Sequence, residues 1–354
     1  MSLSSLWSSR RRLVAPTVLL LAATFSVSAQ DGKSVLKYAG VNLSGAEFNS
    51  GKKPGTLYKD YTYPGPTDYG YFAGKGMNIV RLPFLWERLQ PTAKGEFDPA
   101  QLAQIKKAVA QAKASGLHLI LDPHNYAKYN GALIGSAGAP AEVFADLWRR
   151  LATEFKNDDT VIFGLMNEPN AVSSTDWAAA AQAAINAIRK AGAKNLVLVP
   201  GTAYTGAHSW RSTYYGTSNA VALQPLKDPG NRMAFEAHQY FDKDNSGTKG
   251  ECVSAGAGAG AEKLAGFVSW LRENKKVGFI GEFATADTPV CNQALEGMLS
   301  YIEQNKDVIV GWTWWAAGAW WKNDYPFNVQ PNKDGSDRPQ MSILSKHARK
   351  ITGK

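Results

Sequence analysis

Two glutamates in the sequence stand where a pair of carboxyl groups could act together on one bond. Glu168 follows the apolar run of residues 161–166, and Glu282 follows the apolar run of residues 277–280. Hydrolysis of a glycoside with retention of configuration needs two carboxyl groups ~5–5.5 Å apart, one as acid/base and one as nucleophile. A lone carboxylate after a strand is as often a helix cap or a surface charge. A pair in such positions therefore predicts a hydrolytic centre.

Other polar and aromatic residues lie at or near the ends of further apolar runs. Arg81 lies in the run of residues 77–84, and the other runs lead into histidines, amides, a phenol or indoles. These residues are His124, Asn125, Asn167, His238, Tyr240, Trp314 and Trp315. Side chains that follow parallel strands gather at one end of the sheet. We therefore expect them to surround the two glutamates.

Eight short apolar runs supply the strands that would hold these residues. They cover residues 38–43, 77–84, 117–121, 161–166, 195–199, 233–238, 277–280 and 308–314. Helical periodicity lies between most of them, at residues 99–114, 142–155, 177–190, 262–273 and 293–304. Strands that alternate with helices predict a parallel sheet. Eight units, with no GxGxxG after the first run, favour an α/β fold that closes into a single (β/α)8 barrel.

In such a barrel the fourth and seventh strands lie across the mouth from each other, which would bring Glu168 and Glu282 face to face.

Two segments fit the alternating pattern of strands and helices poorly. Residues 204–226 are rich in Ser, Thr, Tyr and Gly and predict a long surface loop in place of a helix. The sequence SAGAGAGA at residues 254–261 predicts a flexible connection.

Five motifs are similar to those of one enzyme family. They are RLPF at residues 81–84, MNEPN at 166–170, HQYFD at 238–242, GEFA at 281–284 and WWAAGAWW at 314–321. In this order and at this separation they resemble the family 5 glycoside hydrolases, in particular the fungal and bacterial endo-β-1,4-glucanases of that family. The resemblance covers roughly residues 38–348 and implies a (β/α)8 barrel with a catalytic carboxylate pair.

The resemblance implies roles for the residues around the scissile bond. Glu168 matches the acid/base of the family, and Glu282 matches its nucleophile. Asn167 matches the residue that holds the 2-hydroxyl of the cleaved sugar, a contact that should strengthen in an oxocarbenium-like transition state. Arg81 and Tyr240 match groups that hydrogen-bond the nucleophile and keep it ionised.

Further matches concern residues that would line the sugar subsites. His124 and His238 match hydrogen-bonding groups of the subsite that holds the cleaved sugar. The resemblance also implies an aromatic platform under that sugar. We favour Trp315 for it, with Trp314 as the alternative, since strand alternation sends only one of the two into the barrel mouth. Three more tryptophans could stack on further glucose units or pack within surface loops: Trp210, Trp320 and Trp321.

The implied reaction is double displacement, without a cofactor or a metal. Glu282 would attack the anomeric carbon while protonated Glu168 donates to the departing oxygen, and Glu168 would then deprotonate the water that releases the intermediate. The expected partner is a β-glucan chain such as cellulose. Mannan, xyloglucan or another β-glycan stays an alternative, as does a carbohydrate-binding protein without catalysis, and the oligomeric state is open.

The first 29 residues are typical of an export signal. Three arginines at residues 10–12 precede an apolar run over residues 13–25 and small residues at 27–29. This run is shorter than the ~20 residues that span a bilayer, which favours cleavage after Ala29 over a membrane anchor. We therefore expect a secreted catalytic domain over residues 30–354, with no membrane association after cleavage.

Charge argues against a nucleic-acid partner. Residues 1–30 contain three arginines and no acidic residue, so their removal lowers the formal net charge from +9 to +6. The remaining lysines and arginines are scattered among helix faces, whereas nucleic-acid binding would require them to cluster in a stripe.

The chain has two cysteines, Cys252 and Cys291. In an exported protein such a pair favours a disulfide over two free thiols, and too few N and S ligands are present to favour a zinc site.

Asp242 and Asp244 with Asn245 could suggest a cation site. The spacing of acids in an EF-hand is absent, so a solvated loop is the preferred interpretation.

Overall fold

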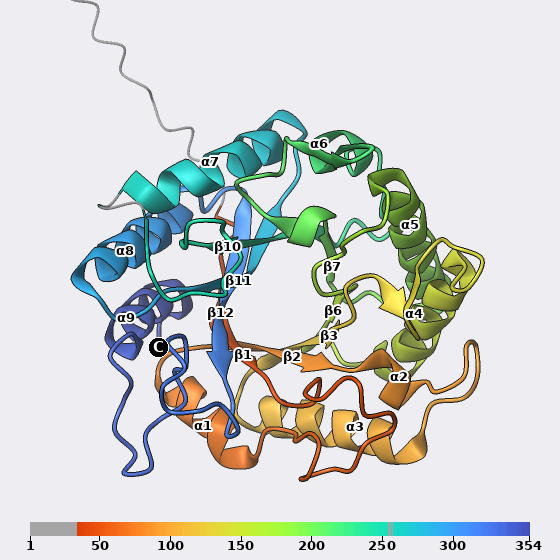
Figure 1. The fold of residues 1–354 in the computed structure, drawn as a ribbon, viewed down its shortest axis with the longest axis horizontal. Helices are drawn as coiled ribbons and strands as arrows, with labels where there is room; N and C mark the ends of the chain where they lie inside the picture. The colour runs from red at the N-terminus through yellow and green to blue at the C-terminus, as the bar shows by residue number, and fades with distance from the viewer. Residues whose placement is uncertain (1–33, 254–255, 257) are drawn as a thin grey trace, which may run out of the picture. The chain divides into compact units, whose positions relative to one another are not determined.

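The computed structural model describes residues 34–253, 256 and 258–354. Within this part, eight parallel strands close into a barrel in the order β1-β12-β11-β10-β7-β6-β3-β2, with helices around it (Figure 1). The strands are β1 (Tyr38–Leu43), β2 (Ile79–Phe84), β3 (His118–Pro123), β6 (Val161–Gly164), β7 (Val197–Pro200), β10 (Met233–Tyr240), β11 (Gly278–Ala284) and β12 (Ile309–Ala317). The predicted (β/α)8 barrel is confirmed.

One apolar side chain from each strand fills the inside of the barrel. These side chains are Tyr38, Ile79, Ile120, Ile162, Leu198, Ala234, Phe279 and Val310. They form a cluster separate from the larger core between the strands and the helices. Because strand side chains alternate between faces, the residues two positions further along β2, β3, β10 and β11 also point inward, at the carboxyl end of the barrel; they are Arg81, Asp122, Glu236 and Gly281.

The outer ring of the barrel is helical. The longer helices are α1 (Pro66–Gly74), α3 (Pro99–Ala114), α4 (Ala141–Phe155), α5 (Ser174–Lys190), α7 (Gly258–Glu273), α8 (Pro289–Gln304) and α9 (Met341–Thr352), and α2 (Trp86–Leu89) and α6 (Asn219–Ala222) are single turns. Asp98, Ser173 and Thr288 precede α3, α5 and α8, and each accepts a hydrogen bond from a backbone N–H of the first turn. These caps explain why the helices begin where they do.

The segment of residues 204–226 forms no long helix, in line with its poor periodicity. It contains most of the 3-10 turn η1 (Ala203–Thr205), a hairpin of β8 (Thr213–Tyr215) with β9 (Thr217–Ser218), and the single turn α6. A second small hairpin, β4 (Lys128–Tyr129) with β5 (Ala132–Leu133), follows β3. Both hairpins belong to loops that follow barrel strands.

The prediction of a flexible connection over residues 254–261 was wrong for its last four residues. Helix α7 begins at Gly258 and includes them. A Cβ on Gly260 would lie 2.4 Å from Met298 Cα, so α7 packs directly against the backbone of α8. The small residues of this stretch therefore allow two helices to approach closely. Residues 254, 255 and 257 lie outside the described part.

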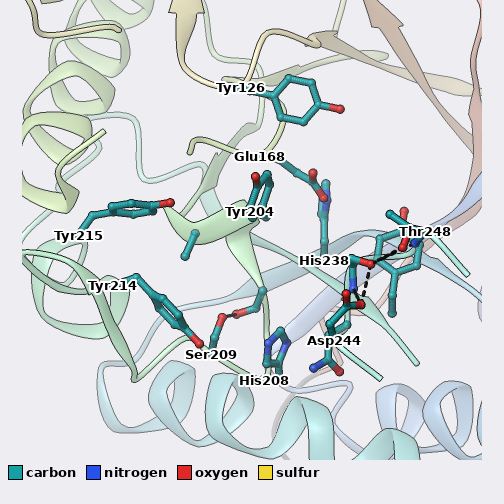
Figure 2. Close-up of a pocket in the computed structure, with 15 residues that line it drawn as sticks. Tyr126, Glu168, Tyr204, His208, Ser209, Tyr214, Tyr215, His238, Asp244 and Thr248 are labelled. Atoms are coloured by element: carbon teal, nitrogen blue, oxygen red, sulfur yellow. Dashed lines mark hydrogen bonds and ion pairs between the residues drawn. The ribbon is translucent and has the colours of Figure 1, made fainter. Parts of the chain in front are cut away.

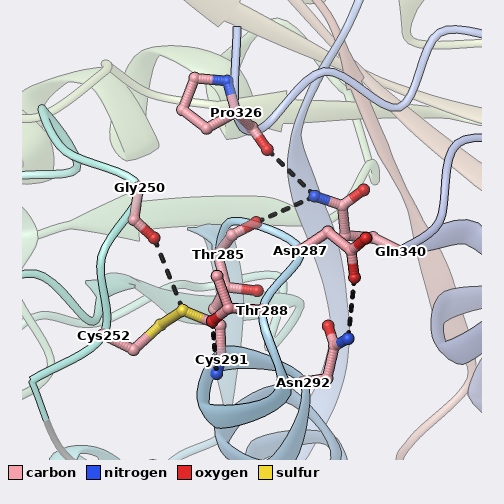
Figure 3. The surroundings of a disulfide bond; sticks show 9 residues. All are labelled: Gly250, Cys252, Thr285, Asp287, Thr288, Cys291, Asn292, Pro326 and Gln340. Carbon is pink, nitrogen blue, oxygen red and sulfur yellow. Dashed lines mark hydrogen bonds between the residues drawn. A yellow bond between two sulfur atoms is a disulfide. The ribbon is translucent and has the colours of Figure 1, made fainter. Parts of the chain in front are cut away.

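Cys252 and Cys291 form the predicted disulfide, with their Cα atoms 5.4 Å apart (Figure 3). Cys291 lies in the first turn of α8, where its N–H donates to the side chain of the cap Thr288. The bond thus ties the segment that follows β10 to the start of the helix that follows β11.

None of the described helices combines the length and the apolar character needed to cross a membrane. The predicted export signal, residues 1–29, lies outside the described residues.

Candidate active site

Strand β10 supplies three buried polar side chains to the mouth of the barrel. Glu236, His238 and Tyr240 alternate along it and point inward, as Ala234 does one step deeper. Gly281 on the neighbouring strand β11 leaves room for two of them. A Cβ on Gly281 would lie 2.0 Å from Glu236 Oε1 and 2.8 Å from His238 Nε2. The GEF motif therefore needs its glycine, because a glutamate and a histidine occupy that space.

Glu282 on β11 is 3% exposed and is held by groups from two other strands. Arg81 Nη1 donates to its Oε1 at 2.8 Å, and Tyr240 Oη donates to its Oε2 at 2.7 Å. His238 Nδ1 lies 3.5 Å from the same Oε2. A guanidinium and a hydroxyl donor together stabilise negative charge on this carboxylate.

Glu168 follows β6 and has a φ of 41°, an uncommon backbone conformation for a residue other than glycine. Its Oε1 lies 2.8 Å from His238 Nδ1 at the wall of an open cavity (Figure 2). Burial raises the pKa of Glu168. The charge of Glu282 raises it further, against the hydrogen bond with His238, which lowers it. Glu168 therefore keeps its proton to higher pH than an ordinary glutamate.

The two glutamates are close to each other. One carboxylate oxygen of each, and one ring nitrogen of His238, all lie within 4.8 Å of one another. His238 thus stands between a carboxyl with a raised pKa and a carboxylate bound by Arg81. The predicted pairing of Glu168 and Glu282 across the barrel mouth is present in the structure.

A buried charge network lies around Arg81. Its Nη2 is 3.2 Å from Asp122 Oδ2, and its Nε is 3.3 Å from Glu236 Oε1. His124 Nδ1 is 2.8 Å from Asp122 Oδ2, and His238 Nε2 is 3.1 Å from Glu236 Oε1. Each of the two carboxylates thus faces the guanidinium and one imidazole.

The two histidines differ in protonation. Burial alone would lower the pKa of His238, but the charge of Glu282 and the hydrogen bonds with Glu168 and Glu236 outweigh it and raise this pKa to about 10. Both ring nitrogens of His238 face carboxylates, so both carry protons near neutral pH.

His124 is held in one tautomer by its neighbours. Its Nε2 lies 3.1 Å from Asn167 Nδ2, because the Asn167 oxygen accepts from Arg81 Nη2 at 2.9 Å. Nε2 must then accept, and the proton of the ring sits on Nδ1, which faces Asp122. Burial opposes protonation of His124, but the hydrogen bond and the charge of Asp122 outweigh it and raise the pKa of this ring.

Three residues of this network were missed in the sequence. Neither Asp122, which directly follows the apolar run of residues 117–121, nor Glu236, which lies inside the run of residues 233–238, was singled out. Asn42 on β1 accepts from Arg81 Nη1 at 2.9 Å and donates to the backbone of Gly281. A charged residue at an inward position of a buried strand is the signal that could have found Asp122 and Glu236.

The two adjacent tryptophans of β12 have different surroundings. Trp314 is fully buried and donates through Nε1 to the Phe327 carbonyl at 2.9 Å. Trp315 is partly exposed, stacks on His124 with ring centroids 5.4 Å apart, and donates to Tyr325 Oη at 3.0 Å. Of the two, Trp315 therefore faces the site, in agreement with our preference for it over Trp314.

Trp320 and Trp321 lie in the loop after β12 and border an open cavity of about 420 Å³ with Phe48 and Tyr325. Trp321 stacks on Tyr325 with centroids 4.2 Å apart, and Trp320 is 37% exposed. This aromatic surface is joined to the site through Tyr325, the hydrogen-bond partner of Trp315.

The prediction that Trp210 could stack on a sugar was wrong. Its side chain is fully buried and packs between β10 and α7, with ring centroids 4.6 Å from Phe267 and 5.3 Å from Trp270. A ring without exposed surface cannot meet a ligand. Trp210 is a core residue that fills the space beside α7.

A second cavity of about 460 Å³ opens beside Glu168 (Figure 2). Its wall contains tyrosines that the sequence analysis did not single out: Tyr126, Tyr204, Tyr214 and Tyr215. Three of them come from the segment of residues 204–226, whose richness in tyrosine was the available signal. His238 and Tyr240 also reach this cavity.

A (β/α)8 barrel with two close carboxyl groups at its mouth, one of them lining a cavity bordered by tyrosines, is typical of glycoside hydrolases. Comparison with known proteins gives the family. The family model described as cellulase (glycosyl hydrolase family 5) matches residues 36–318. This chain therefore belongs to glycosyl hydrolase family 5.

Named relatives and solved structures agree with this assignment. Endo-β-1,4-glucanase B of Aspergillus niger is 40% identical over 336 residues, which cover 93% of this chain and 97% of that protein. The crystal structure of the endo-β-1,4-glucanase Xac0029 from Xanthomonas axonopodis pv. citri is 63% identical, with a TM-score of 0.88 and coverage of 90% of this chain and 100% of that one. The structure of XacCel5A in complex with cellopentaose is 70% identical, with a TM-score of 0.87 and coverage of 88% and 99%.

Proposed function

We propose that this chain is a secreted, retaining endo-β-1,4-glucanase in which Glu168 is the acid/base and Glu282 is the nucleophile. The observation that carries the proposal is that two close carboxyl groups have different surroundings. Glu282 binds Arg81 and Tyr240, whereas Glu168 is buried beside a negative charge that raises its pKa. A retaining glycosidase needs one ionised and one protonated carboxyl group at the start of its reaction.

Their separation supports retention. Oxygens of Glu168 and Glu282 lie within 4.8 Å of each other, nearer than the ~6.5–9.5 Å that inverting enzymes need to admit a water between the carboxyl groups. Glu282 attacks the anomeric carbon and Glu168 protonates the departing oxygen. Water then enters beside Glu168, which removes its proton as the glycosyl–Glu282 bond breaks.

Further residues act on the sugar at the cleavage point. Asn167 is fixed by Arg81 and His124, so its amide can bind the 2-hydroxyl, a contact that strengthens as positive charge develops on the ring. Trp315 supplies the aromatic platform beneath that sugar. His124 and His238 keep Asn167 and Glu168 in place.

A glucan chain is the substrate that best fits the surroundings. Aromatic rings border both cavities, and flat apolar faces of glucose units stack on such rings. Trp320 and Trp321 stack on units on one side of the scissile bond, and Tyr204 contacts units on the other. The relative XacCel5A, solved with cellopentaose, gives further support for a β-1,4-glucan.

Azide rescue tests the two roles. With an activated aryl β-cellobioside, Glu168→Ala should still form the glycosyl intermediate, and azide should capture it as the β-glycosyl azide. In Glu282→Ala, azide should enter the vacated space and give the α-glycosyl azide in one inverting step. The opposite pattern would exchange the roles, and rescue of neither folded variant would contradict double displacement.

Substrate preference is tested by sugar release from carboxymethylcellulose and from galactomannan, followed by the products of a cello-oligosaccharide ladder. Faster release from galactomannan would make the chain a β-mannanase with the same machinery. Tight cello-oligosaccharide binding without turnover would make it a carbohydrate-binding protein.

Secretion rests on the arginines and the apolar run before Ala29. Amino-terminal sequencing of the mature protein should give a start near Gln30. An extracellular product that retains residues 10–12 would contradict the assignment of residues 1–29 as a cleaved signal.

A further inference from the structure

The loop of residues 242–249, here called the Asp242 loop, joins the end of β10 to the disulfide segment and α7. Asp242 is 1% exposed. Its Oδ1 accepts from the Gly247 N–H at 3.1 Å, and its Oδ2 accepts from the N–H groups of Thr248 and Lys249 at 3.2 and 3.3 Å. Ser246 Oγ lies 3.0 Å from Oδ2 and 2.7 Å from Asp244 Oδ1, so its one proton is shared between the two carboxylates. These hydrogen bonds hold the loop in a turn around the carboxylate, whose oxygens accept mainly from backbone N–H groups.

The folded loop lies on the ring of Tyr240. Gly247 has a φ of +69°, and a Cβ built on it would lie 2.6–2.7 Å from Cδ1, Cε1 and Cγ of Tyr240. Nearly equal distances to three adjacent ring atoms put the Gly247 backbone over the face of the ring. No other residue type fits there, both because of this contact and because of the positive φ.

The same ring carries the hydroxyl that donates to Glu282 Oε2 at 2.7 Å. Its position decides whether that hydrogen bond forms, because a phenol pivots about its Cβ and a small rotation moves Oη the most. Phe327 stacks near the ring with centroids 6.0 Å apart. Asp242, Gly247 and Tyr240 therefore form a chain of contacts from a buried carboxylate to Glu282.

We propose that the Asp242 loop is a positioning element for the nucleophile, with Asp242 and Gly247 as positioning residues that act through Tyr240. The proposal rests on the function proposed above, in which Glu282 is the nucleophile. Other residues of the loop, Asp244 and Thr248 among them, line the cavity beside Glu168 (Figure 2). The loop could therefore act instead as a wall for sugar units, and the two roles give different kinetics.

A double-mutant cycle separates these roles. Asp242→Asn keeps the shape of the side chain but weakens its acceptors, and Tyr240→Phe removes the hydroxyl. We expect each to lower kcat/KM about 10- to 100-fold, and the double variant to be no worse than Tyr240→Phe alone, since both changes act on one contact. The loss should fall mainly on kcat. Losses that multiply in the double variant would overturn the proposal.

Two substrates supply the second readout. For a positioning loop, Asp242→Asn should lose activity equally on 4-nitrophenyl β-cellobioside and on cellopentaose. A loss confined to cellopentaose would show that the loop is a wall for sugars and would overturn the proposal. An unchanged kcat/KM for folded Tyr240→Phe would also overturn the proposal, whereas failure of the function proposed for Glu282 would appear as loss of azide rescue in Glu282→Ala, so the two failures are distinguishable.

Asp228→Asn is the matched control. Asp228 lies before the other end of β10, and its oxygens also accept from backbone N–H groups, those of Gly230 and Arg232 at 2.9 and 2.7 Å. This variant should lower the midpoint of thermal unfolding while leaving kcat/KM unchanged. If Asp242→Asn does not fold, Ser246→Ala, which removes one side-chain donor, takes its place in the cycle with the same expectation of non-additivity and a smaller loss.

Discussion

Exchange of Glu236 for glutamine tests whether this buried carboxylate holds the proton on His238. Glu236 Oε1 lies 3.1 Å from His238 Nε2, and both residues are at most 2% exposed. Glutamine keeps the shape of the side chain and removes its negative charge. The pKa of His238, which the surrounding carboxylates raise to about 10 against the effect of burial, should therefore fall.

The size of the fall follows from the type of hydrogen bond. A bond to a charged group contributes ~1.5–3 kcal/mol and a neutral one ~0.5–1.5 kcal/mol. The difference, about 1–1.5 kcal/mol, corresponds to about one pKa unit, so we expect a pKa of about 9 for His238 in Glu236→Gln. A histidine with a raised pKa adds stability below its unfolded pKa of about 6.5 and loses it as pH rises through the folded value. In the variant this loss should be complete about one pH unit lower.

Carbon-13 NMR of histidine-labelled protein measures this directly between pH 6 and 10.5. The chain has five histidines, and the His238 signal is identified by its absence in His238→Asn. Glu96→Gln is the matched control, because Glu96 is an exposed glutamate that pairs with Arg150 on the surface. An unchanged or higher pKa of His238 in folded Glu236→Gln would refute the role given to Glu236.

Three further changes test the disulfide and the two kinds of tryptophan. Replacement of both Cys252 and Cys291 by serine should lower the free energy of unfolding, measured in urea titrations, by about 4 kcal/mol. This value is expected for a bond that closes a loop over a sequence separation of 39, and a loss below about 1 kcal/mol would contradict the loop-closure argument. Trp315→Ala should lower kcat/KM on cello-oligosaccharides roughly 30-fold, the equivalent of about 2 kcal/mol of lost apolar contact, and an unchanged value would exclude a sugar platform there. Trp210→Ala should lower the free energy of unfolding by about 3–5 kcal/mol and leave KM unchanged, because its ring is in the core.

The barrel and the central residues could be predicted because one rule governs both. Parallel strands buried on both faces appear as apolar runs, and their carboxyl ends meet at one mouth. Glu168 and Glu282 follow such runs, and both lie at that mouth in the structure. Local spacing was sufficient for these residues, since Glu168 closely follows strand β6 and Glu282 lies near the end of strand β11.

The tryptophans outside strands could not be placed in this way. Trp210 and Trp320 both lie in segments after strands, with similar neighbours in composition. One is fully buried against α7 and the other is 37% exposed beside a cavity. Whether such a tryptophan is buried or exposed depends on the helix that packs against its loop. This is a long-range contact, and the local sequence pattern does not predict it.

Asp122 and Glu236 were missed for a different reason. Glu236 stands within an apolar run, where a charged residue looks like an interruption of the pattern, and Asp122 comes directly after such a run, two positions before His124. A buried arginine such as Arg81 requires carboxylates around it, because an unpaired charge in a barrel interior costs several kcal/mol. A search for inward-facing acids on strands near Arg81 would have found both residues.

The same balance of charge argues for the place of the catalytic proton. Around the site, the described residues with fixed positive charge are Arg81 and protonated His238, and four carboxyl groups face them. Asp122 has Arg81 and His124 as partners, Glu236 has Arg81 and His238, and Glu282 has Arg81 and Tyr240. Glu168 has His238 alone.

If all four carboxyl groups were ionised, two positive charges would face four negative ones in a largely buried space. Such an excess of negative charge is unfavourable in free energy, and most so at the carboxylate with the fewest hydrogen-bond donors. A single proton on Glu168 reduces this excess from two to one. The proton then sits on a carboxyl group that lines an open cavity, where the departing oxygen of the proposed reaction can take it. Burial raises the pKa of Glu168 and the charge of Glu282 raises it further, which fits the roles of acid and nucleophile that we propose for the two residues.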